Sequence, residues 1–326
     1  MSTPLKSNPA SPRGLVLAAF ATIYLVWGST YLGIRFAVET IPPFLMGAGR
    51  FLIAGVLLYA WLRLTGTPDP GAQHWRNAAV VGGLLLGVGN GLVNWSEQSV
   101  PSGVASLLIA MTPLWFALLD WLRPHGTRPG FQTVLGILIG FAGVVMLVGS
   151  RENLRHQAID PLGVGALLVA SVAWASGSLY ARYTPKPESA LMAVALQMMT
   201  GGTILLVTGV LLAEGSALNW SKVSTRSAIA FLYLTVIGSL VAFTAYSWLL
   251  KHSTPARIST YAYVNPVIAV FLGWAFAGET LTPRMIGAAA VIVLGVIIIT
   301  SRRVSMPPQP TNEAPDSLAQ ADARSP

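Results

Sequence analysis

The dominant pattern along the chain is a series of apolar blocks about 20 residues long, separated by short polar segments. A helix of that length crosses the ~30 Å hydrocarbon layer of a bilayer. The pattern predicts helices at residues 14–38, 42–63, 77–98, 101–123, 131–150, 161–182, 189–213, 227–250, 255–278 and 285–301. The sequence therefore indicates an all-α polytopic membrane protein with ten transmembrane helices.

The composition supports this interpretation and excludes several functions. The chain is 53% hydrophobic and only 10% charged, whereas an ordinary soluble protein has about 25% charged residues. Nearly all charged side chains lie between the apolar blocks. A soluble enzyme, a nucleic-acid-binding protein and a disordered scaffold are therefore excluded, and the partners that remain are the lipid bilayer and small molecules. The net charge of +8 is attributed to basic cytoplasmic loops.

The distribution of Lys and Arg predicts the orientation in the membrane. With the N-terminus inside, the cytoplasmic segments hold Lys6, Arg13, Arg63, Arg76, Arg123, Arg128, Arg182, Lys186, Lys251, Arg257, Arg302, Arg303 and Arg324. The outer segments hold only Arg35, Arg151, Arg155, Lys222, Arg226 and Arg284. Both termini are therefore expected in the cytoplasm: residues 1–13 as a short segment, and residues 302–326 as a polar tail that we expect to be disordered.

The two halves of the chain show weak internal similarity. Trp27 begins the tripeptide Trp-Gly-Ser, and Trp174 begins Trp-Ala-Ser. Pro113 precedes Trp121 by eight residues, as Pro266 precedes Trp274. These matches predict two five-helix repeats, at 14–150 and 161–301, joined by an outer linker at 151–160. Because five is odd, the second repeat must be inverted in the membrane. Inverted repeats are typical of secondary transporters, which bind substrate between the halves near the midplane.

Several stretches carry a resemblance to a known family. These are WGSTYLGIRFAVETIPP, GAGRFLIAG, GNGLVNWSEQSVPSG and YAYVNPVIAVFLGWAFAGETLT. Together they resemble the EamA family of the drug/metabolite transporter superfamily, over roughly residues 15–300. The resemblance implies a permease of the inner membrane that exports amino acids or related small metabolites. A Gly-Glu motif of this family is present as Gly278-Glu279, whereas the first half has Pro124-His125-Gly126 at the corresponding place.

Pro113 and Pro266 are the strongest indication of a binding site that is independent of the family. Each lies near the middle of its predicted span. A proline removes a backbone donor and frees a carbonyl in the preceding turn, and those groups must be satisfied by protein or by water in a cavity. Matching interruptions in two halves favour a transport site with hinges at both prolines. The alternative is a pair of simple packing kinks.

A polar stripe follows one face of the third predicted span. Asn90, Asn94 and Glu97 are spaced at i, i+4 and i+7, so they share one face of a helix. Lipid offers no hydrogen-bond partners, and such a face therefore lines a cavity or contacts another helix. We interpret the stripe as part of a substrate path, with asparagines that only hold helices together as the alternative.

Arg50 is a basic residue about eight residues into the second predicted span. Its position is about 12 Å below the outer boundary, at 1.5 Å per residue. An arginine near the membrane centre costs about 2.5–3.5 kcal/mol on the lenient insertion scale. A partner must offset this cost, and Glu97 could serve only if Arg50 reached upward. A structural Arg50 and an anchor for a substrate carboxylate both remain open.

Aromatic residues gather in the spans that flank the proposed cavity. An aromatic side chain with one polar tip suits an amphipathic metabolite, although for any single one packing or anchoring at the membrane interface is the favoured explanation. The predicted substrate contacts are Trp27, Arg50, Asn90, Asn94, Glu97, Trp115, Trp174, Tyr246, Tyr261, Tyr263 and Asn265. Glycines 83, 87 and 91, and glycines 136 and 140, have the spacing of close helix packing.

The acidic residues limit the substrate. Glu97 and Asp120 lie near the predicted membrane edges, and no Asp or Glu lies at mid-span. A lipophilic polycation needs a buried carboxylate, so a neutral or zwitterionic substrate fits better. The spans offer no obvious proton relay, and both proton coupling and facilitated diffusion remain open.

No motif for a catalytic centre, a metal, a cofactor or ATP is recognised. We therefore expect a transporter that works by alternating access and not an enzyme, without a cofactor. The alternatives are an exporter of larger hydrophobic drug-like compounds, a membrane-embedded enzyme acting on lipid-linked substrates, and a sensor without flux.

Overall fold

The computed structural model describes residues 13–300 of the chain, apart from residues 125, 127, 149–159, 254 and 259. Each of the predicted blocks is helical over most of its described residues, and this part of the chain contains no strand. The predicted N-terminal segment, outer linker and tail fall outside it, except for Arg13 and Asp160. The all-helical prediction is confirmed.

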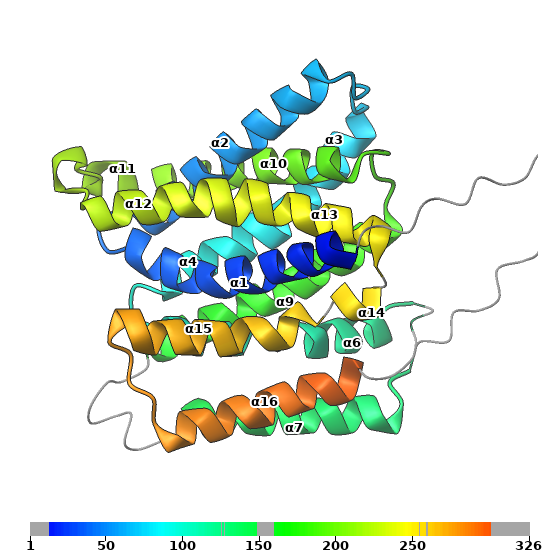
Figure 1. The fold of residues 1–326 in the computed structure, drawn as a ribbon, viewed down its shortest axis with the longest axis vertical. Helices are drawn as coiled ribbons and strands as arrows, with labels where there is room; N and C mark the ends of the chain where they lie inside the picture. The colour runs from blue at the N-terminus through cyan, green and yellow to red at the C-terminus, as the bar shows by residue number, and fades with distance from the viewer. Residues whose placement is uncertain are drawn as a thin grey trace, which may run out of the picture.

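The helices lie side by side in one bundle (Figure 1). Up to residue 148 they are α1 (Arg13–Ala37), α2 (Pro43–Leu64), α3 (Ala72–Gly82), the π-helix η1 (Gly83–Asn90), α4 (Gly91–Ser96), α5 (Ser102–Ile109), α6 (Thr112–Leu122) and α7 (Phe131–Val148). From residue 161 they are α9 (Pro161–Tyr183), α10 (Ala190–Leu211), α11 (Glu214–Ala217), the 3-10 helix η2 (Trp220–Lys222), α12 (Thr225–Tyr233), the π-helix η3 (Leu234–Val241), α13 (Ala242–His252), α14 (Pro255–Ile258), α15 (Tyr261–Ala277) and α16 (Pro283–Thr300). The end of the bundle that carries α11 and the loop from α15 to α16 is called the α11 end, and the opposite end the α14 end.

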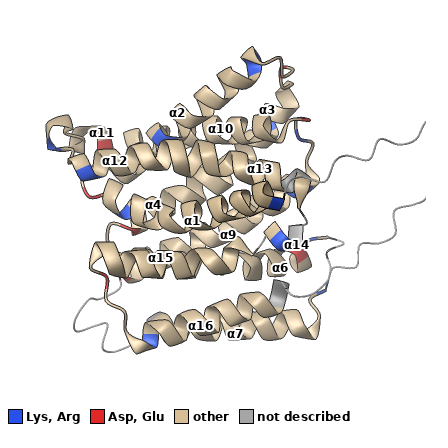
Figure 2. Ribbon diagram, viewed as in Figure 1, with Lys and Arg blue, Asp and Glu red and all other residues tan. Residues whose placement is uncertain are grey.

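Seven helical runs in the described part of the chain are long and apolar enough to cross a membrane. They are Arg13–Ala37, Pro43–Leu64, Ala72–Ser96, Ser102–Leu122, Pro161–Tyr183, Ala190–Leu211 and Thr225–Leu249. Three shorter apolar helices are Phe131–Leu147, Tyr261–Ala277 and Pro283–Ile298. Large apolar side chains such as Leu17, Phe131 and Leu211 are exposed on the outside. Figure 2 shows the charged residues mainly at the helix ends, as expected for a protein whose middle faces lipid.

Two of the long runs contain a π-helical stretch near their centre. In η1 the side-chain nitrogen of Asn90 donates to the carbonyl of Leu85 (3.4 Å), five residues earlier. In η3 the hydroxyl of Ser239 donates to the carbonyl of Leu234 (3.0 Å), again five residues earlier. A π-helix widens the turn and is frequent at functional sites. The sequence analysis did not predict either stretch.

The two prolines behave differently. Pro113 is the second residue of α6, directly after the break that separates α5 from α6. Pro266 lies inside α15, which continues through it. The prediction of a helix break at Pro266 is therefore wrong, and the break lies earlier, between α14 and α15. Because Pro266 is the sixth residue of α15, the carbonyl it frees belongs to Ala262 in the first turn, where the helix is only beginning.

Glycines let two helix pairs approach closely. A methyl group on Gly295 of α16 would lie 2.7 Å from the nitrogen of Gly140 and 2.8 Å from the carbonyl oxygen of Gly136, both in α7. On the other side of the molecule, methyl groups on Gly83 and Gly87 would each lie 3.0 Å from the side chain of Ile204 in α10. The prediction that these glycines serve close helix packing is confirmed. The largest buried apolar cluster lies between these pairs, and includes Ile34, Met111, Leu167, Leu234 and Ile292.

Candidate functional site

Four aromatic side chains from three helices meet between α1, α13 and α15. The ring centroid of Trp27 lies 5.3 Å from that of Phe243, 5.2 Å from Tyr246 and 5.1 Å from Tyr261. The rings of Tyr246 and Tyr261 are 6.3 Å apart. The contacts of Trp27 with Phe243 and Tyr261 are edge-to-face, a favourable geometry for aromatic pairs. These four residues are called the aromatic cluster. Three of them were assigned to one site from the sequence.

Hydrogen bonds hold the first turn of α15 against α1 beside this cluster. The hydroxyls of Tyr24 and Thr260 are 2.5 Å apart. With its amide nitrogen oriented toward two carbonyls, Asn265 donates to the backbone oxygens of Tyr24 and Tyr261 at 3.2 Å each. Gly28 permits the close approach, since a methyl group there would lie 2.8 Å from Ile268. Asn265 therefore fixes the position of Tyr261 next to Trp27.

Arg50 lies buried in the bundle, with only 4% of its surface exposed. Its Nε donates to the hydroxyl of Ser239 in η3 (3.0 Å), and its guanidinium carbon lies 4.7 Å from the ring centroid of Phe51. Among the described residues no carboxylate forms an ion pair with it, and its Nη1 has no hydrogen-bond partner. The pairing of Arg50 with Glu97 considered from the sequence is therefore not formed.

The predicted polar stripe faces two neighbouring helices. Asn94 is fully buried and donates to the carbonyl of Pro43 at the start of α2 (3.4 Å). Glu97 is also fully buried, and in the described part of the chain both of its carboxylate oxygens have no hydrogen-bond partner. Arg35 of α1 donates to the backbone oxygen of Glu97, while Asn90 bonds within its own helix. Asn94 thus contacts the start of α2 and Glu97 contacts α1 through its backbone oxygen, and no hydrogen bond between the stripe and the aromatic cluster is found among the described residues.

The remaining predicted contacts are dispersed. Trp115 packs edge-to-face on Phe141 at 5.3 Å, and its ring nitrogen has no partner among the described residues. Trp174 contacts Gly89 closely enough that a methyl group on that glycine would lie 3.1 Å from the indole. Tyr263 packs against the largest apolar cluster. No ring contact between these three residues and the aromatic cluster is found among the described residues.

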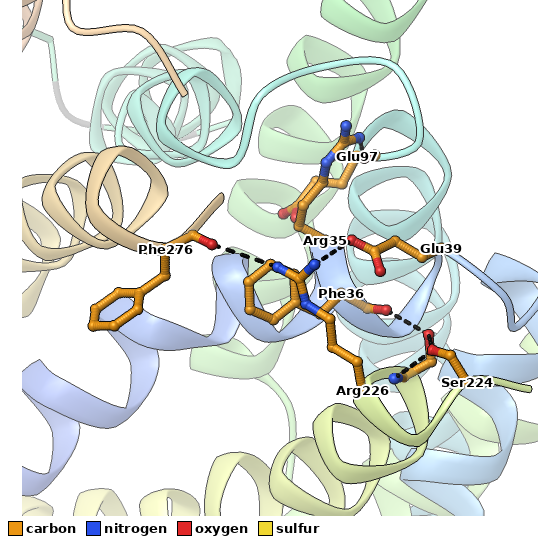
Figure 3. A network of polar contacts seen from close by, with 8 residues as sticks. Arg35, Phe36, Glu39, Glu97, Ser224, Arg226 and Phe276 are labelled. Atoms are coloured by element: carbon orange, nitrogen blue, oxygen red, sulfur yellow. Dashed lines mark hydrogen bonds and ion pairs between the residues drawn. The ribbon is translucent and has the colours of Figure 1, made fainter. Parts of the chain in front are cut away.

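The α11 end of the bundle is closed by contacts that join distant segments (Figure 3). Arg226 of α12 forms an ion pair with Glu39 (3.5 Å), donates to the carbonyl of Phe276 (3.4 Å) and lies over the ring of Phe36 at 3.4 Å. The hydroxyl of Ser227 donates to the carbonyl of Phe36 (2.7 Å). The end of α1, the start of α12 and the end of α15 are thus tied together.

A second connection at this end uses the Gly-Glu motif. One carboxylate oxygen of Glu279 accepts hydrogen bonds from the backbone N–H (2.6 Å) and the hydroxyl (2.7 Å) of Ser102, and the other accepts from the N–H of Gly103 (3.0 Å). Glu279 therefore caps the N-terminus of α5, where unpaired N–H groups favour a negative charge. Glu214 similarly accepts from the N–H groups of Phe44 and Leu45 at the start of α2.

Sequence reasoning missed Phe243, Ser239 and the capping role of Glu279. Phe243 and Ser239 are one turn apart on one helical run, but neither residue type stands out in an apolar block. The Gly-Glu motif was noticed, yet its partner is distant in sequence. No group of three or more His, Cys, Asp or Glu in the described part of the chain could hold a metal ion.

Comparison with known proteins identifies the family. The model of the EamA-like transporter family matches the chain twice, at residues 13–149 and 161–301. The chain belongs to the EamA-like transporter family. A family relative is an uncharacterized inner membrane transporter, YedA of Escherichia coli strain K12, 38% identical over 296 residues that cover 90% of this chain and 94% of YedA. The protein is thus a multi-pass membrane transporter of the EamA type.

More distant EamA-type relatives are also similar over most of their length. A probable terminal-alkyne amino-acid exporter of Streptantibioticus cattleyicolor is 24% identical, over 87% of this chain and 93% of the relative. One solved crystal structure matches the fold with a TM-score of 0.60 and 21% identity, covering 89% of this chain and 98% of the other. This last likeness supports the fold alone.

Proposed function

We propose that this EamA-type protein is a secondary transporter that exports small metabolites, amino acids or related neutral or zwitterionic compounds, across the inner membrane by alternating access. The observation that carries the proposal is a buried Arg50, without a carboxylate partner among the described residues, whose partner Ser239 lies one helical turn from Phe243 of the aromatic cluster. A cationic group beside amphipathic rings can hold both ends of such a compound. The amino-acid exporter among the relatives agrees with this class.

The proposed architecture is two inverted five-helix repeats, residues 14–150 and 161–301. Two observations support it. The family model matches the chain twice at nearly these ranges. The third helical run of each half also contains a π-helix, η1 or η3, and the fourth run of each half is interrupted. With both termini in the cytoplasm, as the Lys and Arg distribution favours, the α11 end faces outward.

In the proposed cycle the two ends of the bundle open in turn. The contacts of Arg226 and Glu279 close the α11 end, so export requires them to separate after substrate binds. Pro113 and the break between α14 and α15 provide places where helices can bend. A hinge role for Pro266 stays a prediction, since α15 continues through this residue.

The proposed first contacts are Trp27, Arg50, Tyr246, Tyr261 and Asn265. Contact of substrate with Asn90, Asn94, Glu97, Trp115, Trp174 or Tyr263 stays a prediction. Proton coupling and facilitated diffusion are both compatible with the proposal, and neither a cofactor nor catalysis forms part of it. The second candidate function is export of larger hydrophobic compounds, which the apolar character of the aromatic cluster favours.

Counterflow in proteoliposomes tests the proposal. Purified protein is reconstituted with one unlabelled compound inside, and uptake of the labelled compound is measured without any gradient. The panel contains amino acids, small neutral metabolites and larger hydrophobic compounds. We expect saturable exchange of one class, absent from protein-free liposomes, and a repeat with a pH difference decides coupling. Absence of exchange across the panel, with folding verified by size-exclusion chromatography, would contradict the proposed function.

A further inference from the structure

The positive charge of Arg50 has no ion-pair partner among the described residues. Arg50 is the eighth residue of α2 and 96% of its surface is removed from solvent. The described residues place no carboxylate within ion-pair distance of it, and only its Nε has a hydrogen-bond partner. A buried charge is retained only where a partner or a ligand compensates it. The free Nη1 is therefore an unused donor in the interior of the protein.

The neighbours of Arg50 orient the guanidinium without neutralising it. The hydroxyl of Ser239 uses its proton on the carbonyl of Leu234, so its oxygen is left to accept from Nε of Arg50. Gly238 has no side chain to crowd this pair. A methyl group at that position would lie 3.4 Å from Nη2 of Arg50 and 3.3 Å from the side chain of Thr30. The π-helix η3 thus contacts the guanidinium of Arg50 through Ser239 and Gly238, with Thr30 of α1 beside it.

Two members of the aromatic cluster lie about one helical turn from residues that adjoin Arg50. Phe243 follows Ser239 by four residues, and Thr30 follows Trp27 by three, with the hydroxyl of Thr30 donating to the carbonyl of Trp27 (2.7 Å). One turn is about 5.4 Å along a helix. The residues that hold the guanidinium and the nearest members of the aromatic cluster are therefore about one turn apart along α1 and along the run from η3 to α13, a separation on the scale of a small molecule with an acidic head and an apolar body.

We infer that Arg50 binds the carboxylate of the transported molecule, and that the body of this molecule lies against the aromatic cluster. This inference rests on the proposed function and names its substrate class as organic carboxylates. The two Nη groups of an arginine form a fork that matches both oxygens of a carboxylate. An amine on the same molecule finds ring faces and tyrosine hydroxyls in the cluster, whereas a compound that is only cationic meets the uncompensated charge of Arg50. Ser239 acts as a positioning residue for the guanidinium.

The test measures binding to purified protein with labelled pairs that differ only at the acid. The pairs are alanine, leucine and phenylalanine, each with its amide. The three corresponding acids that lack the amine are also measured, to show whether the protein binds zwitterions or anions. We expect at least one acid to bind at least tenfold more tightly than its amide. Arg50→Gln should remove this preference, and Arg50→Lys should restore part of it. Arg63→Gln, an exposed arginine on the same helix, is the matched control and should behave as wild type.

The outcomes separate the inference from the proposed function. Equal binding of acids and amides, no binding of any acid, or an unchanged acid preference in Arg50→Gln would overturn the inference. If Arg50→Gln fails to fold, the inference is tested by two other measurements: the preference of the wild-type protein for acids over amides, and the change in that preference in Arg50→Lys. Ser239→Ala should weaken acid binding severalfold and Ser239→Thr should recover it, which a purely structural serine would not do. Counterflow of neutral compounds without acid binding would leave the proposed function standing.

Discussion

The carboxylate of Glu279 accepts both the backbone N–H and the hydroxyl of Ser102, at 2.6 and 2.7 Å. The two residues are 177 positions apart in the sequence, and their contact joins the loop after α15 to the first turn of α5. Loss of a helix cap costs about 0.5–2 kcal/mol, and a charged acceptor strengthens each bond. This one carboxylate therefore stabilises the closed α11 end.

Replacing Glu279 by alanine removes the cap from α5. We expect the unfolding temperature of the detergent-solubilised protein to fall by several degrees, because three hydrogen bonds to the start of α5 are lost. The measurement is thermal unfolding followed by tryptophan fluorescence. Glu188→Ala, at an exposed position between α9 and α10, is the control and should change little. Equal unfolding temperatures for Glu279→Ala and wild type would show that the cap is energetically unimportant.

Replacing Glu97 by glutamine should have the opposite effect on stability. Both carboxylate oxygens of Glu97 are buried without a partner among the described residues, so ionisation there is costly. An amide of the same shape carries no charge, and we expect Glu97→Gln to unfold at a temperature at least as high as wild type. Glu279→Gln, measured under the same conditions, should unfold at a lower temperature. A marked loss of stability in Glu97→Gln would mean that the carboxylate has a stabilising partner.

Replacing Trp27 by alanine removes the central ring of the aromatic cluster. We expect counterflow to fall at least tenfold, since three ring contacts depend on this side chain. Trp27→Phe keeps an aromatic body and should retain more of the exchange. Trp121→Ala, at a side chain that is 45% exposed, serves as the control. Unchanged counterflow in folded Trp27→Ala would place the substrate elsewhere.

Replacing Gly295 by alanine tests the packing of α16 on α7. The new methyl group would lie 2.7 Å from the nitrogen of Gly140, and overpacking of this kind costs about 1–3 kcal/mol. We expect a lower unfolding temperature. Gly165→Ala in α9, which has open space around the new methyl group, should be neutral or stabilising by up to about 1 kcal/mol. A change of the unfolding temperature in the same direction for Gly295→Ala and Gly165→Ala would argue against tight packing of α16 on α7.

The helices and part of the site could be predicted from the sequence because a helix that crosses lipid must be apolar over about 20 residues. Apolar length alone located the helical blocks, and Arg50 was recognisable as the charge that interrupts one of them. Trp27, Tyr246 and Tyr261 were assigned to one region, and the structure places their rings in contact. The spacing of small residues was enough to predict close packing through Gly136 and Gly140.

Other features depend on partners that no local pattern reveals. Asn94 shares a helical face with Glu97, but only the position of α2 determines that Asn94 bonds to Pro43. In both π-helices a side chain bonds to a carbonyl five residues back, as Ser239 does, and the hydropathy of the sequence does not reveal these stretches. Pro266 was expected to break its helix, yet it lies close enough to the start of α15 for the helix to continue.

The most direct test of alternating access uses a single introduced cysteine, because the chain contains none of its own. Phe243→Cys places a thiol in the aromatic cluster, and a membrane-impermeant thiol reagent is applied separately to each face of the membrane. We expect the thiol to be labelled from both faces, and a transported substrate to change the ratio of the two labelling rates. Adding Glu279→Ala should increase labelling from the outer face. Labelling from one face only, in every condition, would contradict transport by alternating access.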